Sequence, residues 1–108
     1  MNKEIIVTSG EEINGKRVVE VLGIVKGSTV RARNIGRDIG AGFKNLVGGE
    51  IKTYTDMANN ARDEAFNRMV NNAIDEGADA IIGFRFATSM IMQGASEMLA
   101  YGTAVKLK

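Results

Sequence analysis

The sequence contains neither cysteine nor histidine. Their absence removes the thiolate nucleophile, the side chain best suited to move protons near neutral pH, and the ligands that most often bind transition metals. Disulfide bonds are excluded as well, so cysteine usage does not indicate a redox compartment. The sequence does not favour nucleophilic catalysis, because no histidine can activate the serines at positions 9, 28, 89 and 96.

Long hydrophobic runs and a strong charge excess are also missing. No apolar stretch approaches the about 20 residues that a helix needs to cross a bilayer. The apolar stretch Ile5–Val7 is too short for a secretory signal, and no small-residue cleavage site follows it. A net charge of +1 gives no general attraction to nucleic acid or anionic membranes. We therefore expect a cytoplasmic protein that binds neither.

Phosphate-binding loops are absent too. The glycine-rich stretch Gly36–Lys44 fails the P-loop spacing, because Asn45 follows the lysine where that motif requires serine or threonine. No dinucleotide fingerprint occurs. What remains is ordinary for a globular chain: 108 residues, 44% hydrophobic and 25% charged. This length predicts a single domain, residues 1–108, with one modest core.

The first half of the chain reads mainly as strands. A short strand is predicted at Ile5–Val7, followed by a turn at Asn14-Gly15. The stretch Arg17–Arg31 is rich in β-branched residues and predicts a long strand with a bulge at Gly23 or Gly27. A basic cluster of Lys26, Arg31, Arg33 and Arg37 indicates a solvated loop or strand edge. A short, glycine-weakened helix is then predicted from the apolar stripe Ile35, Ile39, Phe43 and Leu46.

The second half predicts one long helix and a hairpin of two long strands. The helix runs from about Glu50 or Thr53 to Glu76, and Gly77 ends it. The hairpin consists of Ala80–Met92, a turn at Gln93-Gly94, and Ser96–Lys108. The predicted fold is therefore α+β: an antiparallel sheet with a long C-terminal hairpin, packed against one long and one short helix.

The two predicted faces of this hairpin differ in the size of their side chains. A two-residue loop pairs even positions of the first strand with odd positions of the second, which predicts one bulky apolar face beneath the long helix. This face would contain Ile82, Phe84, Phe86, Met90, Met92, Leu99, Tyr101, Val105 and Leu107. The opposite face would contain mainly small residues: Gly83, Arg85, Ala87, Ser89, Ala100, Gly102 and Ala104.

Strand length predicts an assembly. Strands of about 12 residues extend about 40 Å, whereas a compact domain of this size is about 34 Å across. The hairpin should therefore overhang its own domain, where its small-residue face is suited to packing on another copy. Arg85 lies in the middle of that face, where an unpaired charge would be costly. We expect an intersubunit salt bridge at Arg85, with a bound anion as the alternative.

The methionines offer a possible soft-metal site. Met90 and Met92 share one strand face near the hairpin tip, and Glu97 is predicted on the same apolar face. Thioether ligands suit Cu(I) or a similar soft ion. Methionine is also the common filler of irregular cores, so Met90 and Met92 can equally be core residues, and Glu97 an exposed residue of the tip.

Several segments together resemble the YbjQ-like family, whose label names heavy-metal binding. The matching segments are Gly48-Gly49-Glu50, Tyr54, Asn60-Ala61-Arg62, Ala65, Glu76–Gly83 and Glu97–Val105. The closing Ala-Tyr-Gly-Thr-Ala-Val is the most specific of them. The resemblance implies an α+β subunit of a homo-oligomeric ring, a homopentamer, and directs attention to Glu50, Tyr54, Arg62, Glu97 and Tyr101. Glu50 also suits a helix N-terminus, and Tyr101 also suits sheet packing.

Three functions follow from these observations. The favoured one is a non-enzymatic homo-oligomer that binds a small ligand or ion at subunit interfaces or serves a structural role. The candidate ligand-binding residues are Glu50, Tyr54, Arg62, Arg85 and Tyr101. The second is a metal-binding protein that uses Met90, Met92 and Glu97, with a metal ion as cofactor. The third is an enzyme with an interface pocket in which Arg85, Tyr54 or Glu50 acts.

Overall fold

The computed structural model describes residues 4–32 and 48–108, with side chains described for 4–31 and 58–108. The elements in these ranges are β1 (Ile6–Val7), β2 (Val18–Ala32), α2 (Gly48–Asp75), β3 (Ala80–Met92) and β4 (Ala95–Leu107). These confirm the predicted strands, the long helix and the hairpin turn to within two residues. The predicted short helix around Ile35–Leu46 lies outside the described residues.

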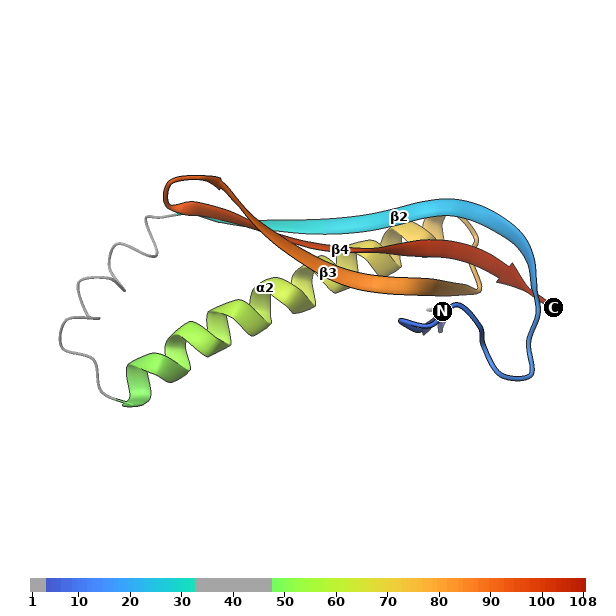
Figure 1. Ribbon diagram of the computed structural model, residues 1–108, viewed down its shortest axis with the longest axis horizontal. Helices are drawn as coiled ribbons and strands as arrows, with labels where there is room; N and C mark the ends of the chain where they lie inside the picture. The colour runs from blue at the N-terminus through green and yellow to red at the C-terminus, as the bar shows by residue number, and fades with distance from the viewer. Residues whose placement is uncertain (1–3, 33–47) are drawn as a thin grey trace.

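The four strands form one sheet in the order β1-β3-β4-β2, and α2 lies across one of its faces (Figure 1). β4 pairs antiparallel with both β2 and β3, whereas β1 runs parallel to β3. The sheet is therefore mixed, and the predicted antiparallel sheet was wrong at this edge. The chain after β1 continues along β3, where Phe84 N donates to Thr8 O at 3.0 Å and Gly83 N donates to Gly10 O at 2.9 Å.

The end of α2 follows directly from Gly77. This residue has a φ of 82°, a left-handed conformation that glycine adopts without steric cost. Its N–H donates to Ile74 O at 2.9 Å, and Ala78 N donates to Ala73 O at 3.0 Å. These two bonds form a Schellman cap, which satisfies the last helix carbonyls and turns the chain into β3.

The core lies between α2 and the strands β2 and β4. On α2 it is formed by an alanine-rich stripe, in which Ala61, Ala65, Met69 and Ala73 are buried. On the sheet, Val25, Ile81, Ala100 and Ala104 are buried, and Phe84 packs edge-on against Phe66 with ring centroids 5.4 Å apart. Small residues on both layers let the helix lie close to the sheet.

The prediction of which hairpin face meets α2 was right for Phe84 of β3, which packs on Phe66, but wrong for the middle of β4. Ala100, Gly102 and Ala104, predicted on the far side, are buried, whereas Tyr101 is 36% exposed. The ladder contains two register shifts. At the first, Met92 pairs with Ala95 as a two-residue loop requires, but Met90 pairs with Ser96; at the second, Arg85 pairs with Tyr101, but Ile82 pairs with Thr103. One extra residue reverses the parity, so β3 and β4 pair even with even through the middle of the hairpin.

The molecule is elongated, with principal extents of 55 × 27 × 27 Å. This agrees with the expectation that the hairpin overhangs the domain, and the last residues of β3, Thr88–Met92, are all exposed. Within the described ranges, no helix is long and apolar enough to cross a membrane.

Candidate functional site

Arg85 and Tyr101 are brought together by the sheet, since they are direct partners across β3 and β4. Both lie on the side of the sheet away from α2, which we call the outer face. Arg85 was predicted among the small residues of the hairpin, but the register shift places it opposite Tyr101 instead. Its Nη1 donates to Ser9 O at 2.8 Å and to Phe84 O at 2.7 Å. Within the chain, the guanidinium therefore ties the segment after β1 to β3.

The three candidate metal ligands are not brought together as predicted. Glu97 pairs with Ser89 and Val30, whereas Met90 pairs with Ser96, so alternation places Glu97 and Met90 on opposite faces. In the part of the chain that the structure describes, no three residues of the types aspartate, glutamate, histidine or cysteine are grouped as metal ligands. A site for a metal ion is therefore not formed by these side chains within one chain.

The remaining candidates all lie on α2. Arg62 is half-buried, and its Nη2 donates to the side-chain oxygen of Asn59 on the preceding turn. Glu50 is in the first turn of α2, where a carboxylate suits the helix dipole, and Tyr54 is one turn later. Both precede residue 58, outside the residues whose side chains the structure describes. Their assignment as ligand-binding residues stays a prediction.

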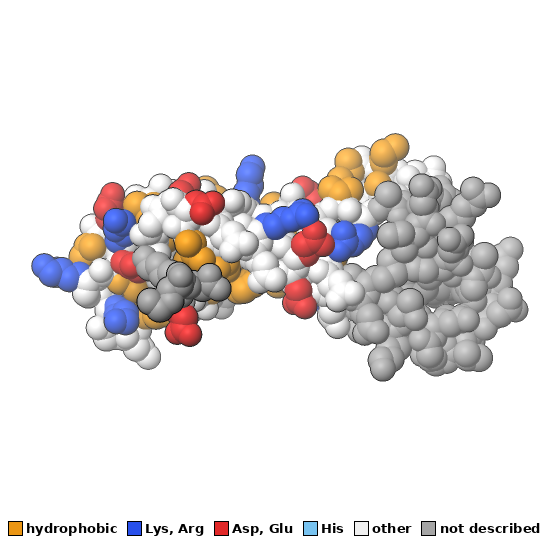
Figure 2. All heavy atoms as spheres, turned by 180° about the vertical axis from the view of Figure 1, so that it is seen from behind, with side chains coloured by type: hydrophobic (Ala, Val, Ile, Leu, Met, Phe, Trp, Pro, Cys, Tyr) orange, Lys and Arg blue, Asp and Glu red, His pale blue; other side chains and the backbone are white. Residues whose placement is uncertain are grey.

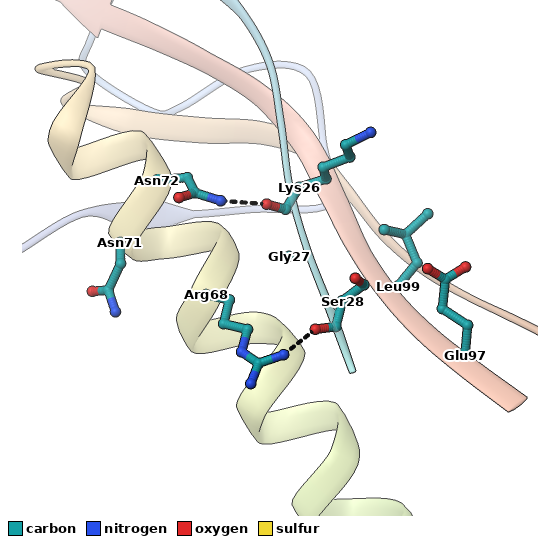
Figure 3. Close-up of a pocket in the computed structure, with 8 residues that line it drawn as sticks. All are labelled: Lys26, Gly27, Ser28, Arg68, Asn71, Asn72, Glu97 and Leu99. Atoms are coloured by element: carbon teal, nitrogen blue, oxygen red, sulfur yellow. Dashed lines mark hydrogen bonds between the residues drawn. The ribbon is translucent and has the colours of Figure 1, made fainter. Parts of the chain in front are cut away.

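A polar cleft that the sequence did not predict lies between α2 and the free edge of β2 (Figure 3). Its volume is about 640 Å³, and its lining includes Lys26, Ser28, Arg68, Asn71, Asn72 and Glu97. Two helix side chains reach the strand: Asn72 Nδ2 donates to Lys26 O at 2.7 Å, and Arg68 Nη1 donates to Ser28 O at 2.5 Å. Because β2 is an edge strand, these bonds occupy backbone acceptors that another strand could otherwise use.

Glu64 joins the same helix face to β2 through two arginines. Its Oε2 accepts a hydrogen bond from Arg31 Nη2 at 2.9 Å, and its Oε1 accepts one from Arg68. The bond from Arg31, followed by the charge of Arg68, lowers the pKa of Glu64 from its ordinary value of 4.5. The spacing of Glu64 and Arg68 was visible in the sequence, but the contact with Arg31 required the fold.

Comparison with known proteins identifies the family. The YbjQ family, whose description reads "Putative heavy-metal-binding", matches residues 5–108. A UPF0145 protein of Methanoculleus marisnigri is 62% identical over 102 residues, covering 94% of this chain and 95% of its own length. A UPF0145 protein of Archaeoglobus fulgidus is 56% identical over 108 residues and covers both chains completely. The chain therefore belongs to the YbjQ family.

A solved structure supports the fold. A protein of unknown function from Pediococcus pentosaceus, placed in the DUF74 family, superposes with a TM-score of 0.64. The match covers 96% of this chain and 98% of that chain, with 18% sequence identity. At this identity, the comparison shows a shared fold and carries no information on ligands.

Proposed function

We propose that this YbjQ-family chain acts as a homo-oligomer, a ring of five subunits, that binds a small ligand or ion where its copies meet. We favour this role over that of an enzyme with an interface pocket, because the chain has no cysteine or histidine to serve as nucleophile or proton shuttle. The proposal combines the family resemblance with one structural observation, the exposed apolar surface of the β3–β4 hairpin.

That surface is concentrated at the hairpin tip. Met90, Ile91 and Met92 are 76%, 54% and 66% exposed, and they follow one another in the chain. Figure 2 shows apolar side chains gathered at this end of the molecule. A contiguous exposed apolar patch is costly in water and usually marks an interaction site. A second copy of the chain is the partner that the family resemblance favours.

The outer face offers further surface for the same purpose. Ile24 and Val30 of β2 are 75% and 52% exposed, and Tyr101 of β4 lies on the same side of the sheet. The free edge of β2 is less suited to pairing with a neighbouring strand, because Asn72 and Arg68 bind two of its carbonyls. We therefore expect copies to meet through side chains of the hairpin and outer face.

Metal binding is the second candidate, favoured by the family description. Glu97 is half-buried and Met90 and Met92 are exposed, so a neighbouring copy could complete a ligand set that one chain does not form. A site of that kind would exist only in the oligomer. Ligand identity and assembly are therefore best measured together.

Native mass spectrometry of protein purified without added metal or chelator tests the proposal. We expect a five-subunit ring that retains additional mass, whose value distinguishes a metal ion from an organic molecule. A ring of bare subunits would remove support for ligand binding while leaving the assembly intact. A monomer across the accessible concentration range would refute the proposal.

A further inference from the structure

A second cavity lies inside the chain, between α2 and the sheet. The helix backbone touches β2 at Gly27, and toward its N-terminus α2 diverges from the strands (Figure 1). The space that opens has a volume of about 270 Å³. It is lined by Thr29 and Arg31 of β2, Ala58 and Ala61 of α2, and Thr88, Ser96, Glu97 and Met98 of the hairpin.

Thr29 is the distinctive residue of this cavity. It is only 2% exposed, and its hydroxyl has no hydrogen-bond partner among the described residues. A buried hydroxyl without a partner costs folding free energy, and valine would fill nearly the same volume without that cost. A polar group kept at such a position is explained if a bound molecule supplies its partner.

The rest of the lining defines the chemistry of that molecule. Ala58, Ala61 and Met98 provide apolar surface, which suits an apolar body. Among the described lining residues the cation is Arg31, which is already paired with Glu64 at 2.9 Å. Among the residues of the lining that the structure describes, a negatively charged ligand would therefore find no unpaired cation. The volume falls just below the about 300–1,000 Å³ of drug-sized sites, so the ligand is small.

We propose that this cavity binds a small uncharged molecule with an apolar body and one hydroxyl-like group that hydrogen-bonds the Thr29 hydroxyl. The lining residues named above belong to a single chain, so the proposal goes beyond the function proposed above and does not depend on the oligomer. Phenol has the required size and chemistry and serves as the probe.

The test is a phenol titration of the full-length protein, followed by NMR of labelled alanine, methionine and threonine methyl groups. We expect saturable shifts confined to the lining: Ala58, Ala61, Met98 and the methyl groups of Thr29 and Thr88. Thr29→Val should weaken binding about three- to tenfold, the equivalent of one net hydrogen bond. Thr103→Val is the matched control, because it removes the same group from β4 outside the cavity, and it should leave the affinity unchanged.

A second variant tests the location independently of the hydroxyl. Ala58→Leu adds three carbons at a half-buried helix position that borders the cavity, and it should abolish the saturable shifts while the spectrum stays folded. The proposal is overturned if the shifts are unsaturable, if they cluster on the outer face, or if Thr29→Val binds phenol as tightly as Thr103→Val. Shifts that persist in Ala58→Leu would also overturn it.

Discussion

Gly27 of β2 lies directly against the α2 backbone at Ala65: a Cβ on Gly27 would come within 2.3 Å of the Ala65 carbonyl oxygen. It would also lie 2.4 Å from the backbone nitrogen of Met69. Neither atom can move without displacing the helix. This single position therefore sets the distance between the two layers, and with it the widths of the cavities on either side.

Gly27→Ala should consequently destabilise the protein. We expect a loss of about 3 kcal/mol, at the upper end of overpacking effects, because backbone rather than a flexible side chain must give way. Urea unfolding followed by circular dichroism measures this loss. Gly10→Ala is the control: the nearest neighbour of its added Cβ is the Thr8 hydroxyl oxygen at 3.6 Å, so the change should be within about 0.5 kcal/mol. Equal stabilities of the two variants would contradict the close approach.

Asn71 and Asn72 provide a matched pair of positions for testing the hydrogen bond between α2 and the edge of β2. Both are exposed and line the polar cleft, but among the described residues only the side-chain amide of Asn72 has a hydrogen bond, to Lys26 O at 2.7 Å. Asn72→Ala should lower the free energy of unfolding by about 1 kcal/mol, the net value of one hydrogen bond. Asn71→Ala should have almost no effect. Thermal unfolding of the two variants side by side measures the difference in stability. Identical melting temperatures would contradict a stabilising hydrogen bond from Asn72 to β2.

The lowered pKa of Glu64 predicts that this residue contributes to stability in a pH-dependent way. Because its pKa is lower in the folded protein than its ordinary value of 4.5, the ionised carboxylate stabilises the fold. That contribution is fully present above about pH 5 and is lost as the pH falls through the lowered pKa of the folded state. Glu64→Gln should therefore be less stable than the wild type at pH 7, with a difference that shrinks below pH 4.5.

Chemical unfolding at a series of pH values measures this difference. Asp63→Asn is the control, since it removes a carboxylate from the adjacent exposed position of α2, which has no ion pair among the described residues. Its effect at pH 7 should be smaller than that of Glu64→Gln. High salt should also reduce the effect of Glu64→Gln, because the three charged groups are partly exposed. A difference that stays constant from pH 7 to pH 3 would contradict the assignment.

Local patterns were sufficient to predict the elements but not their faces. Gly77 and Gln93-Gly94 act through backbone conformation alone, so their positions give the end of α2 and the hairpin turn directly. The face of the hairpin depends on a register, and one extra residue near Ile91 reverses it. No residue in this stretch indicates the register shift, since Met90, Ile91 and Met92 fit a regular strand as well as a bulged one.

The sites depended even more on the tertiary fold. The Arg85–Tyr101 pair, the Glu64–Arg31 contact and the Thr29 cavity each join residues far apart in the chain. A threonine within a valine-rich strand carries no sequence signal of its own, because threonine is common in exposed strands. Its burial, and its lack of a partner among the described residues, became visible only once α2 was placed over β2.

Thr29→Val should stabilise the protein in the absence of ligand. Removing a buried hydroxyl that has no partner recovers its desolvation cost, so we expect a gain of about 1–2 kcal/mol in the free energy of unfolding. Thr103→Val, at a half-buried position outside the cavity, should change stability by less than about 0.5 kcal/mol. Urea denaturation gives both values. A loss of stability in Thr29→Val would show that water already satisfies the hydroxyl.

Two double variants at the hairpin tip distinguish apolar packing between copies from metal binding by the methionine sulfur atoms. Replacing Met90 and Met92 together by leucine keeps the exposed apolar surface and removes both thioethers, whereas replacing both by serine removes the surface as well. If the tip packs on another copy, the leucine variant should remain a ring and the serine variant should dissociate at concentrations where the wild type is assembled. Native mass spectrometry measures the subunit number and any retained metal in each.

If the wild-type ring retains a metal, the same pair of variants decides whether the methionine sulfur atoms bind it. A ring of the leucine variant that keeps the wild-type metal would exclude thioether ligands, whereas loss of the metal with the ring intact would identify them. Glu97→Gln in the wild-type background then tests the carboxylate separately, because it removes the charge and keeps the side-chain volume. If the serine variant stays a ring as stable as the wild type, the hairpin tip is not the contact between copies. The exposed outer face around Ile24 and Tyr101 would then be the surface to mutate next.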